Sequence, residues 1–294
     1  MSAVVSETRR ATPAIRDLVA LTKPRVTALV IATTAGGLWL APGTLTLVKT
    51  LATLLATSAV VGAANALNCW LERDVDRHMT RTRNRPLPAG RLQPGHALGL
   101  GIVLAVISVP VLALVASPMA GLLATVALVS YVGLYTPLKQ RTPKALLVGA
   151  VPGALPPLIG WAAATGGVEA GGLALFGILF VWQLPHFLAI AMFRKEEYAR
   201  AGIAVLPAVR GERVTKIHAA FWAIVLVPVT LAPAWLGVAG TAYAIVAAVL
   251  GAIFVGLALA GLRPSAGRKW ARTLFLASLV YLPAIFIALV ADAG

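Results

Sequence analysis

The side chains best suited to chemistry lie in the segment NALNCWLERDVD, directly after an apolar run. Asn68, Glu72 and Asp76 are four residues apart, so on a helix they fan over only about 80° of one face. Asn65 lies about one turn before Asn68 on an adjoining part of that face, whereas Asp74 points elsewhere. Mg²⁺ usually takes one or two protein carboxylates together with phosphate oxygens of a substrate. A solvated helix end would explain a single carboxylate, but polar groups in register beside lipid are costly. The spacing therefore predicts a metal site.

Two further groups of side chains are candidates for binding phosphate. The row RTRNRPLPAGR follows the acidic segment and holds Arg81, Arg83, Arg85 and Arg91. Guanidinium groups hold phosphate oxygens bidentately, which favours a diphosphate clamp. Tyr135 and Lys139 are one turn apart at the end of a later apolar run, where they could supply a phenolic donor and a point charge. The alternative is ordinary, because basic residues and tyrosines also anchor membrane helices at the interface.

Two other candidates lie in WQLPHFLAIAMFRKEEYARAG. Glu196 and Glu197 form a second acidic group, which could hold a second Mg²⁺ or act as a base if it faced the first. His186 lies within an apolar run after Gln183 and Pro185, where a polar ring is unusual. A histidine that is satisfied structurally is an equally good explanation of the pattern.

The composition of the chain indicates which kind of secondary structure positions these side chains. The chain has 294 residues, of which 59% are hydrophobic and 12% are charged, whereas soluble domains have about 25% charged residues. Repeated long apolar runs without strand alternation indicate an all-α membrane protein. The net charge of +15 does not indicate nucleic acid, because the basic residues cluster in short loops between the runs. The single Cys69 excludes an intrachain disulfide and a cysteine-cluster metal site.

Nine spans are long enough to cross about 30 Å of hydrocarbon. They cover approximately 25–42, 46–68, 96–115, 118–136, 145–164, 171–192, 217–237, 241–262 and 271–290. With nine spans, 24 of the 25 Lys and Arg residues fall on one side and only Lys49 on the other. This asymmetry predicts a cytoplasmic N-terminus and an external C-terminus.

No domain boundary interrupts the apolar part of the chain. We expect a cytoplasmic N-terminal segment over 1–22, with a short interfacial helix over 14–21, and a single membrane domain over 23–294. The segment has no signal-peptide pattern and no long Arg- and Ser-rich transit peptide. These features favour a bacterial inner membrane.

The motifs together resemble the UbiA superfamily of intramembrane prenyltransferases. The resemblance rests on N-x-x-x-[DE]-x-x-x-D at the end of the second span, Y-x-x-x-K after the fourth and an acidic sixth loop. Three longer strings resemble the branch of that superfamily that farnesylates haem, and the similarity runs from about Lys23 through the ninth span. They are DVDRHMTRTRNRPLP, YTPLKQRTPKALLVGAVPGALPPLIGW and FVWQLPHFLAIAMFRKEEYARAGIAVLP.

The resemblance implies nine helices around a central cavity. It also implies Mg²⁺-dependent transfer of a farnesyl group from farnesyl diphosphate to a vinyl group of haem B, which gives haem O for terminal oxidase assembly. Haem would be a substrate rather than a permanent cofactor. The implied partners are the lipid bilayer and a haem A synthase or oxidase assembly factors, with no nucleic acid.

The resemblance also assigns roles to residues. Mg²⁺ and diphosphate would be bound by Asn68, Glu72 and Asp76, with Asn65 alongside, while Tyr135 and Lys139 would hold phosphate and Arg83 and Arg85 would add charge. Glu197 would belong to a second acidic site, and His186 would contact the haem. Two departures from the superfamily pattern matter. Glu72 stands where an Asp is more usual, and Phe193 and Ala201 flank Glu197 where D-x-x-x-D would place a second acid.

Two alternative functions predict different features. A quinone or chlorophyll precursor prenyltransferase would need a pocket for another acceptor, against which WQLPHF argues. A transporter would place charged residues deep in several spans, whereas nearly every acid here lies at a cytoplasmic helix end.

Overall fold

The computed structural model describes residues 14–43 and 45–293, and within them the chain is helical without strands. The first group of helices is α1 (Ile15–Leu21), α2 (Pro24–Leu40), α3 (Leu47–Asp76), α4 (Pro94–Val111), η1 (Leu112–Ala116), α5 (Pro118–Val129), η2 (Ser130–Tyr135) and α6 (Thr136–Leu138). The second group is α7 (Ala145–Thr165), α8 (Ala170–Phe193), α9 (Lys195–Arg200), α10 (Leu206–Val209), α11 (Glu212–Trp235), α12 (Thr241–Ala260) and α13 (Arg268–Ala291). The segments η1 and η2 are π-helical.

The chain is a multi-pass membrane protein. Among the described residues, eight helices are long and apolar enough to cross a membrane, and α1 with α2 makes a ninth if the bent pair is one span. The chain bends by 52° between α1 and α2. The bend arises at Lys23, because the residue before a proline is disfavoured in helical conformation. Eight of the nine predicted spans are therefore met by the described helices, and the first, predicted over 25–42, is counted as a span only if α1 and α2 are taken together.

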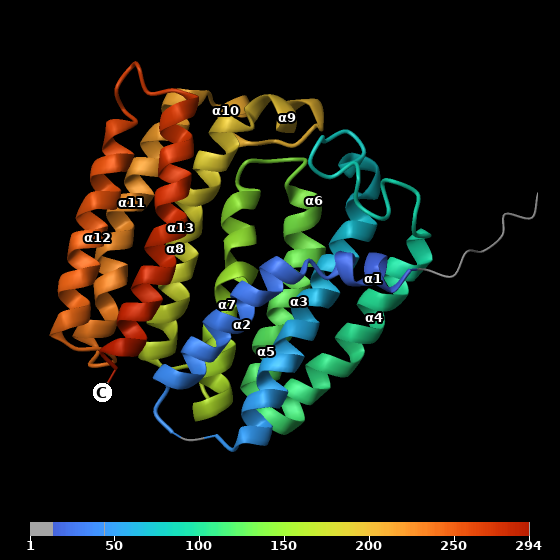
Figure 1. The fold of residues 1–294 in the computed structure, drawn as a ribbon, viewed down its shortest axis with the longest axis vertical. Coiled ribbons are helices and arrows are strands. Elements are labelled where there is room, and N and C mark those ends of the chain that lie inside the picture. Colours follow the sequence, from blue (N-terminus) through green and yellow to red (C-terminus); the bar gives the residue numbers. More distant parts are fainter. Residues whose placement is uncertain (1–13, 44, 294) are drawn as a thin grey trace, which may run out of the picture.

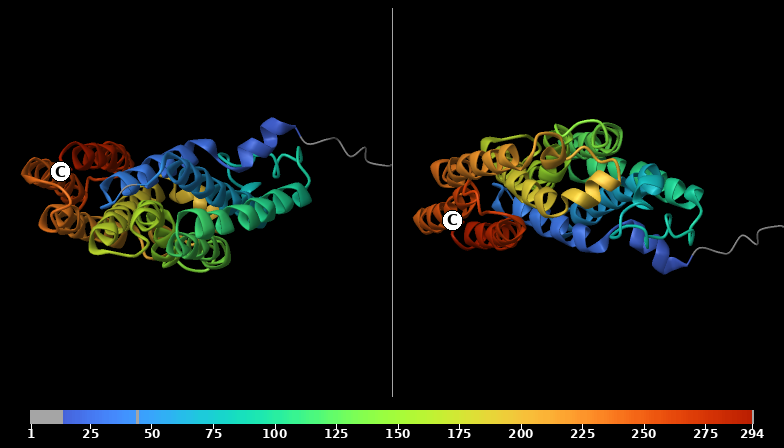
Figure 2. Two further views of the ribbon diagram at one scale, coloured as in Figure 1. Left: turned by 90° about the horizontal axis from the view of Figure 1, so that it is seen from below. Right: turned by 90° about the horizontal axis from the view of Figure 1, so that it is seen from above.

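The helices are arranged around the central pair α7 and α8 (Figure 1). Helices α3, α4 and α5 group on one side of that pair, and α11, α12 and α13 on the other, as the two further views also show (Figure 2). Helix α3 packs mainly against α4, while α13 packs against α8 and α12. Consequently α3 and α13 stand on opposite sides of the molecule.

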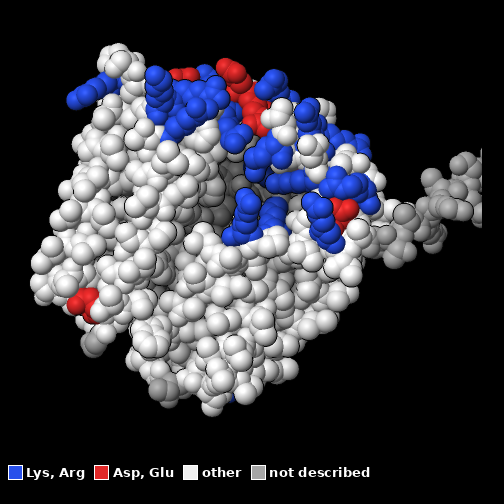
Figure 3. Space-filling model, in the orientation of Figure 1, with Lys and Arg blue, Asp and Glu red and all other residues white. Residues whose placement is uncertain are grey.

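A cavity of about 950 Å³ lies between these groups, with walls from α2, α3, η2, α7, α8 and α13. Most of its lining is apolar, but one end is ringed by charged and amide side chains. In the space-filling view, Lys and Arg gather around a hollow at one end of the molecule, while most of the rest of that face is uncharged (Figure 3). The expectation of helices around a central cavity is confirmed.

Helix α3 runs two turns past its predicted end, continuing to Asp76. Its 30 residues span about 45 Å at 1.5 Å per residue, which exceeds the hydrocarbon thickness of about 30 Å. The acidic segment is therefore a direct extension of a membrane helix. At the N-terminus, α1 matches the short helix predicted there, and the remainder of the predicted N-terminal segment (1–13) lies outside the described residues.

Helices α2 and α7 cross at unusually close range. A Cβ atom on Gly37 would lie 2.0 Å from the carbonyl oxygen of Pro157, and one on Gly160 would lie 2.2 Å from that of Thr34. Only glycine lets two backbones approach so closely, as at small-residue contacts between membrane helices. This crossing sets the position of α2, whose N-terminal end carries Lys23 into the polar end of the cavity.

Candidate active site

One face of α3 supplies the acidic part of the cavity wall. Asn65, Asn68, Glu72 and Asp76 are all buried and all line the cavity, as their four-residue spacing predicts. Glu72 and Asp76 are only 3% and 1% exposed. Asp74 lies on the outer surface, where its side chain is 64% exposed and pairs with Arg73 and Arg77. Two carboxylates are therefore held away from bulk water at the edge of an apolar cavity.

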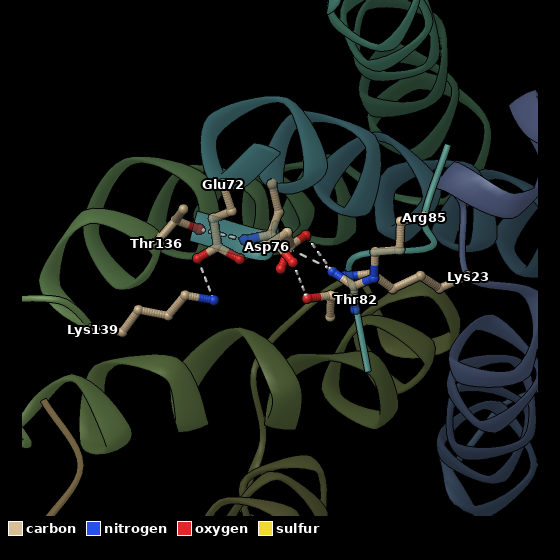
Figure 4. A network of polar contacts seen from close by, with 8 residues as sticks. Lys23, Glu72, Asp76, Thr82, Arg85, Thr136 and Lys139 are labelled. Atoms are coloured by element: carbon tan, nitrogen blue, oxygen red, sulfur yellow. Dashed lines mark hydrogen bonds and ion pairs between the residues drawn. The ribbon is translucent and has the colours of Figure 1, made fainter. Parts of the chain in front are cut away.

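Each buried carboxylate contacts one cationic side chain (Figure 4). Lys139 forms an ion pair with Glu72, and Arg85 donates a hydrogen bond of 2.7 Å to Asp76 Oδ2. A buried carboxylate without such a partner would be strongly disfavoured. The two cations come from the loops after α6 and after α3, so three chain segments meet at this end of the cavity.

The ammonium group of Lys139 is in an unusual environment. Burial, and then the positive charge of Lys23, lowers the pKa of Lys139 below its usual range. Contact with the Glu72 carboxylate acts in the opposite direction, because an opposite charge favours the ammonium form. The charge of Lys139 therefore depends on whether the Glu72 carboxylate pairs with Lys139 or with another cation.

Lys23 also belongs to the site, although no motif in the sequence indicated it. Its Nζ donates a hydrogen bond of 3.2 Å to Asn68 Oδ1, and its backbone has a left-handed conformation with φ of 51°. Positive φ is uncommon for residues other than glycine and marks functional sites when the surrounding structure enforces it. The sequence signal was the following Pro24, which indicates a helix break but says nothing of where the ammonium group points.

The π-helical segment η2 positions the aromatic part of the polar end. Tyr131 and Tyr135 line the cavity with ring centroids 5.4 Å apart, and Lys139 Nζ lies 5.4 Å from the centroid of Tyr135. The predicted one-turn spacing of Tyr135 and Lys139 is therefore realised. Thr136 accepts a hydrogen bond of 3.1 Å from Asn68 Nδ2. Single π-helical turns are rare in proteins, and those that occur are often found at functional sites. No pattern in the sequence predicted this one.

The arginine row divides between the cavity and the surface. Arg85 and Arg81 line the cavity, whereas Arg83 is exposed and outside its lining. The loop turns between Met79 and Leu92 through a series of local backbone hydrogen bonds. The spacing made all four arginines of the row candidates, and the resemblance selected Arg83 and Arg85. The structure brings Arg81 and Arg85 to the cavity wall and leaves Arg83 outside it.

Glu197 lies apart from the α3 carboxylates. It accepts hydrogen bonds from Thr80 Oγ1 at 3.0 Å, Arg81 N at 3.3 Å and Arg194 at 2.7 Å. Partial burial raises the pKa of Glu197, but these donors outweigh it and the net pKa is lowered. Glu197 therefore fastens the loop after α3 to the end of α8, and it does not line the cavity of Glu72 and Asp76.

His186 is buried in α8 and lines the apolar part of the cavity. Its ring stacks on Trp182 with centroids 4.7 Å apart and lies 5.0 Å from Phe275. Ser278 donates its hydroxyl hydrogen to the Phe275 carbonyl at 2.6 Å, so His186 Nδ1, 2.6 Å from Ser278 Oγ, must be the donor in that pair. This tautomer leaves the lone pair on Nε2, the nitrogen that a metal centre or proton donor could use.

The α3 face fits a hard divalent cation. No group of three or more His, Cys, Asp and Glu residues gathers anywhere in the described part of the chain. Mg²⁺ does not need one, because it binds through one or two carboxylates and takes further oxygens from phosphate and water. Two buried carboxylates beside an asparagine amide match that donor set. Among the residues that the structure describes, no comparable group of acidic side chains gathers around Glu197.

Comparison with known proteins adds a family pattern to this geometry. The sequence model of the UbiA prenyltransferase family matches residues 29–279. Protoheme IX farnesyltransferase of Anaeromyxobacter dehalogenans (strain 2CP-C) is 56% identical over 275 residues, which are 94% of this chain and 93% of that protein. Protoheme IX farnesyltransferase of Myxococcus xanthus (strain DK1622) is 52% identical over 276 residues, with 94% of each chain covered.

Solved structures share the fold at low sequence identity. A structure of digeranylgeranylglyceryl phosphate synthase superposes with a TM-score of 0.81 at 16% identity, covering 94% of this chain and 97% of that one. A UbiA homologue from Archaeoglobus fulgidus bound to GPP and Mg²⁺ superposes with a TM-score of 0.65 at 15% identity, covering 93% and 99%. The arrangement of helices around the cavity is thus a known one.

Proposed function

Because this chain belongs to the UbiA prenyltransferase family, we propose that it transfers a farnesyl group from farnesyl diphosphate to a vinyl group of haem B, giving haem O. Relatives that are more than half identical carry the name protoheme IX farnesyltransferase. The product would be passed to a haem A synthase or to oxidase assembly.

One observation carries the proposal. The buried carboxylates Glu72 and Asp76 form the polar end of a cavity of about 950 Å³ whose remaining wall is largely apolar and aromatic. Such a cavity matches a substrate with a charged head and a long hydrocarbon tail. An ion pathway would need polar groups along its length, which this lining does not provide.

The charged side chains have distinct roles in this proposal. Glu72 and Asp76, with Asn68 beside them and Asn65 adjoining, would hold Mg²⁺, which neutralises negative charge on a departing diphosphate when bound. Lys139, Tyr135, Arg81 and Arg85 would bind the diphosphate oxygens, with Lys23 beside them. Groups arranged in advance around developing charge are the most effective stabilisers, because they need no reorganisation during the reaction.

The reaction follows from this arrangement. The bond between C1 of the farnesyl group and oxygen breaks, and diphosphate leaves with the electron pair. The π electrons of the haem vinyl group form the new bond to C1. Water then adds to the carbon left positive and loses a proton, which produces the hydroxyl group. The apolar wall keeps water from C1 before the vinyl group reaches it.

Two further residues support the reaction from outside the diphosphate site. His186 lines the cavity and is our candidate for contact with the haem. Glu197 is proposed to act by positioning, since its hydrogen bonds fix the loop that carries Arg81. We place the protein in a bacterial inner membrane, where the charge asymmetry favours an orientation with the polar end of the cavity facing the cytoplasm.

The activity is tested directly with purified protein in lipid. Incubation with haem B, farnesyl diphosphate and Mg²⁺ is expected to yield haem O, detected by mass spectrometry. Excess EDTA should remove at least nine-tenths of the product, which is of the order expected when transition-state charge is no longer neutralised, and added Mg²⁺ should restore it. A folded sample that makes no haem O beside an active relative, while prenylating a quinone precursor, would overturn the acceptor assignment.

Substitution of His186 with alanine is expected to weaken haem binding by about tenfold. The change removes Nε2 and a ring that stacks on Trp182, which together are worth about 1 to 2 kcal/mol. The measurement is titration of haem followed through its Soret absorption. Ser278→Ala is the matched variant, because it keeps the ring and removes only its orienting hydroxyl, so a smaller loss is expected. An unchanged Soret spectrum and affinity in His186→Ala would remove this residue from the acceptor site.

A further inference from the structure

A second cavity, of about 430 Å³ and partly lined by α9, adjoins the first. The two cavities share Phe193, Arg194 and Arg272 in their linings. The second is polar, and its charged lining comes from the end of α8, α9, and the starts of α11 and α13. Thr80, in the loop after α3, also lines it.

The lining of this second cavity carries an excess of positive charge. Its basic residues are Arg194, Lys195, Arg200, Arg268 and Arg272, and its acidic residues are Glu196, Glu197 and Glu212. The ion pairs of Arg194 with Glu197 and of Lys195 with Glu212 use two of the basic groups. Arg200, Arg268 and Arg272 make no ion pair with any residue that the structure describes. The excess of two positive charges suits a ligand with two carboxylates.

A strip of aromatic rings leads from the basic cavity into the main one. The guanidinium carbons of Arg194 and Arg272 lie 5.8 and 6.0 Å from the ring centroid of Phe193. Phe193 meets Phe275 edge to face at 5.6 Å, and Phe275 in turn lies 5.0 Å from His186. Aromatic rings in this arrangement favour a flat, apolar ligand that enters the main cavity with a charged edge left behind among the arginines.

We propose that the second cavity binds the two propionate groups of the haem acceptor, with Arg272 and Arg268 as the principal partners. The assignment rests on the proposed function. In haem B the propionates occupy one edge of the ring and the vinyl groups lie toward the opposite edge. Propionates held on the α13 side therefore direct the vinyl edge across the cavity toward α3, where the diphosphate would leave.

The test compares haem with its dimethyl ester, in which the propionates carry no charge. Binding of each to the full-length protein in nanodiscs is followed by Soret absorption, so the readout does not depend on prenyl transfer. Arg272→Gln is expected to weaken binding of haem by about tenfold, as loss of one charged hydrogen bond does, and to leave binding of the ester unchanged. Arg268→Gln should act in the same direction. The control is Lys269→Gln, which removes the same charge from α13 but lies outside both cavity linings.

Four outcomes overturn the inference. Equal weakening for haem and its ester would mean that Arg272 acts only on the fold. A wild-type protein that binds both ligands equally would mean that propionates are not recognised, even if haem O is still made. If the difference between wild type and variant appears only with phosphatidylglycerol in the nanodisc, the cluster binds a lipid phosphate instead. A wild-type protein that binds no haem at all would remove the proposed function, and the inference with it.

Discussion

Replacing Asp76 with asparagine is expected to lower turnover by about 10²- to 10³-fold, and Glu72→Gln should have a similar effect. Each change removes one of the two buried negative charges that line the polar end of the cavity. Loss of a single group that stabilises developing charge in a preorganised site typically costs that much in kcat. The measurement is haem O formation at saturating farnesyl diphosphate across a range of Mg²⁺ concentrations, where the variants should also need more Mg²⁺.

The matched control is Asp74→Asn. Asp74 lies two residues from Asp76 on the same helix, but its side chain is 64% exposed and pairs with arginines on the surface. We expect its activity and its Mg²⁺ requirement to match the wild type. Because Asp76→Asn also leaves Arg85 without its buried partner, thermal stability must be measured alongside. An Asp76→Asn protein that is folded and keeps more than half of its activity would remove this carboxylate from the mechanism.

Replacing Gly160 with alanine is expected to destabilise the protein by about 3 kcal/mol, the upper end of typical overpacking costs. The added Cβ would stand 2.2 Å from the Thr34 carbonyl oxygen and 3.0 Å from the Leu38 nitrogen. Both are backbone atoms, so no side chain can rotate away and α2 must move from α7. The measurement is the midpoint of thermal unfolding in detergent, followed by size-exclusion chromatography.

Gly99→Ala provides a control of opposite sign. Gly99 lies within α4, and a Cβ atom there would meet nothing within 4 Å. The same substitution should therefore leave stability unchanged or raise it by about 0.5 to 1 kcal/mol, the usual gain from replacing a helical glycine. A Gly160→Ala protein as stable as Gly99→Ala would show that the close crossing of α2 and α7 is not needed for the fold.

The sequence was sufficient to predict the membrane-spanning helices and the side chains that share one wall of the site. Apolar runs and loop charge predicted the spans, and the four-residue spacing predicted that Asn68, Glu72 and Asp76 would share a wall. These are local properties, since a helix fixes the relation between residues three or four apart. Extension of α3 to Asp76 follows the same rule, although the predicted span ended at the last apolar residue.

What the sequence could not supply are relations between distant segments. The contact of Lys23 with Asn68 depends on a left-handed residue and on the crossing of α2 with α7, neither of which has a local pattern. The choice of Arg81 over Arg83 depends on the turns of an irregular loop. Glu197 looked like part of a second acidic site by composition. Two of its three hydrogen-bond donors, Thr80 and Arg81, come from a loop that only the tertiary fold brings next to it, whereas Arg194 is a local partner.

The gathering of charge at one end of the molecule has an electrical consequence. Among the described residues, that end holds 22 of the 23 basic and seven of the nine acidic residues, a net charge of +15, while the opposite end has a net charge of −1, a difference of 16 charges. A membrane potential acts on each charge with about 2.3 kcal/mol per 100 mV. In the orientation proposed here, a potential that is negative inside would favour the inserted molecule over its inverted form by roughly 37 kcal/mol at 100 mV. The same charges that attract an anionic substrate would thus also stabilise this orientation of the protein when the membrane potential is negative inside.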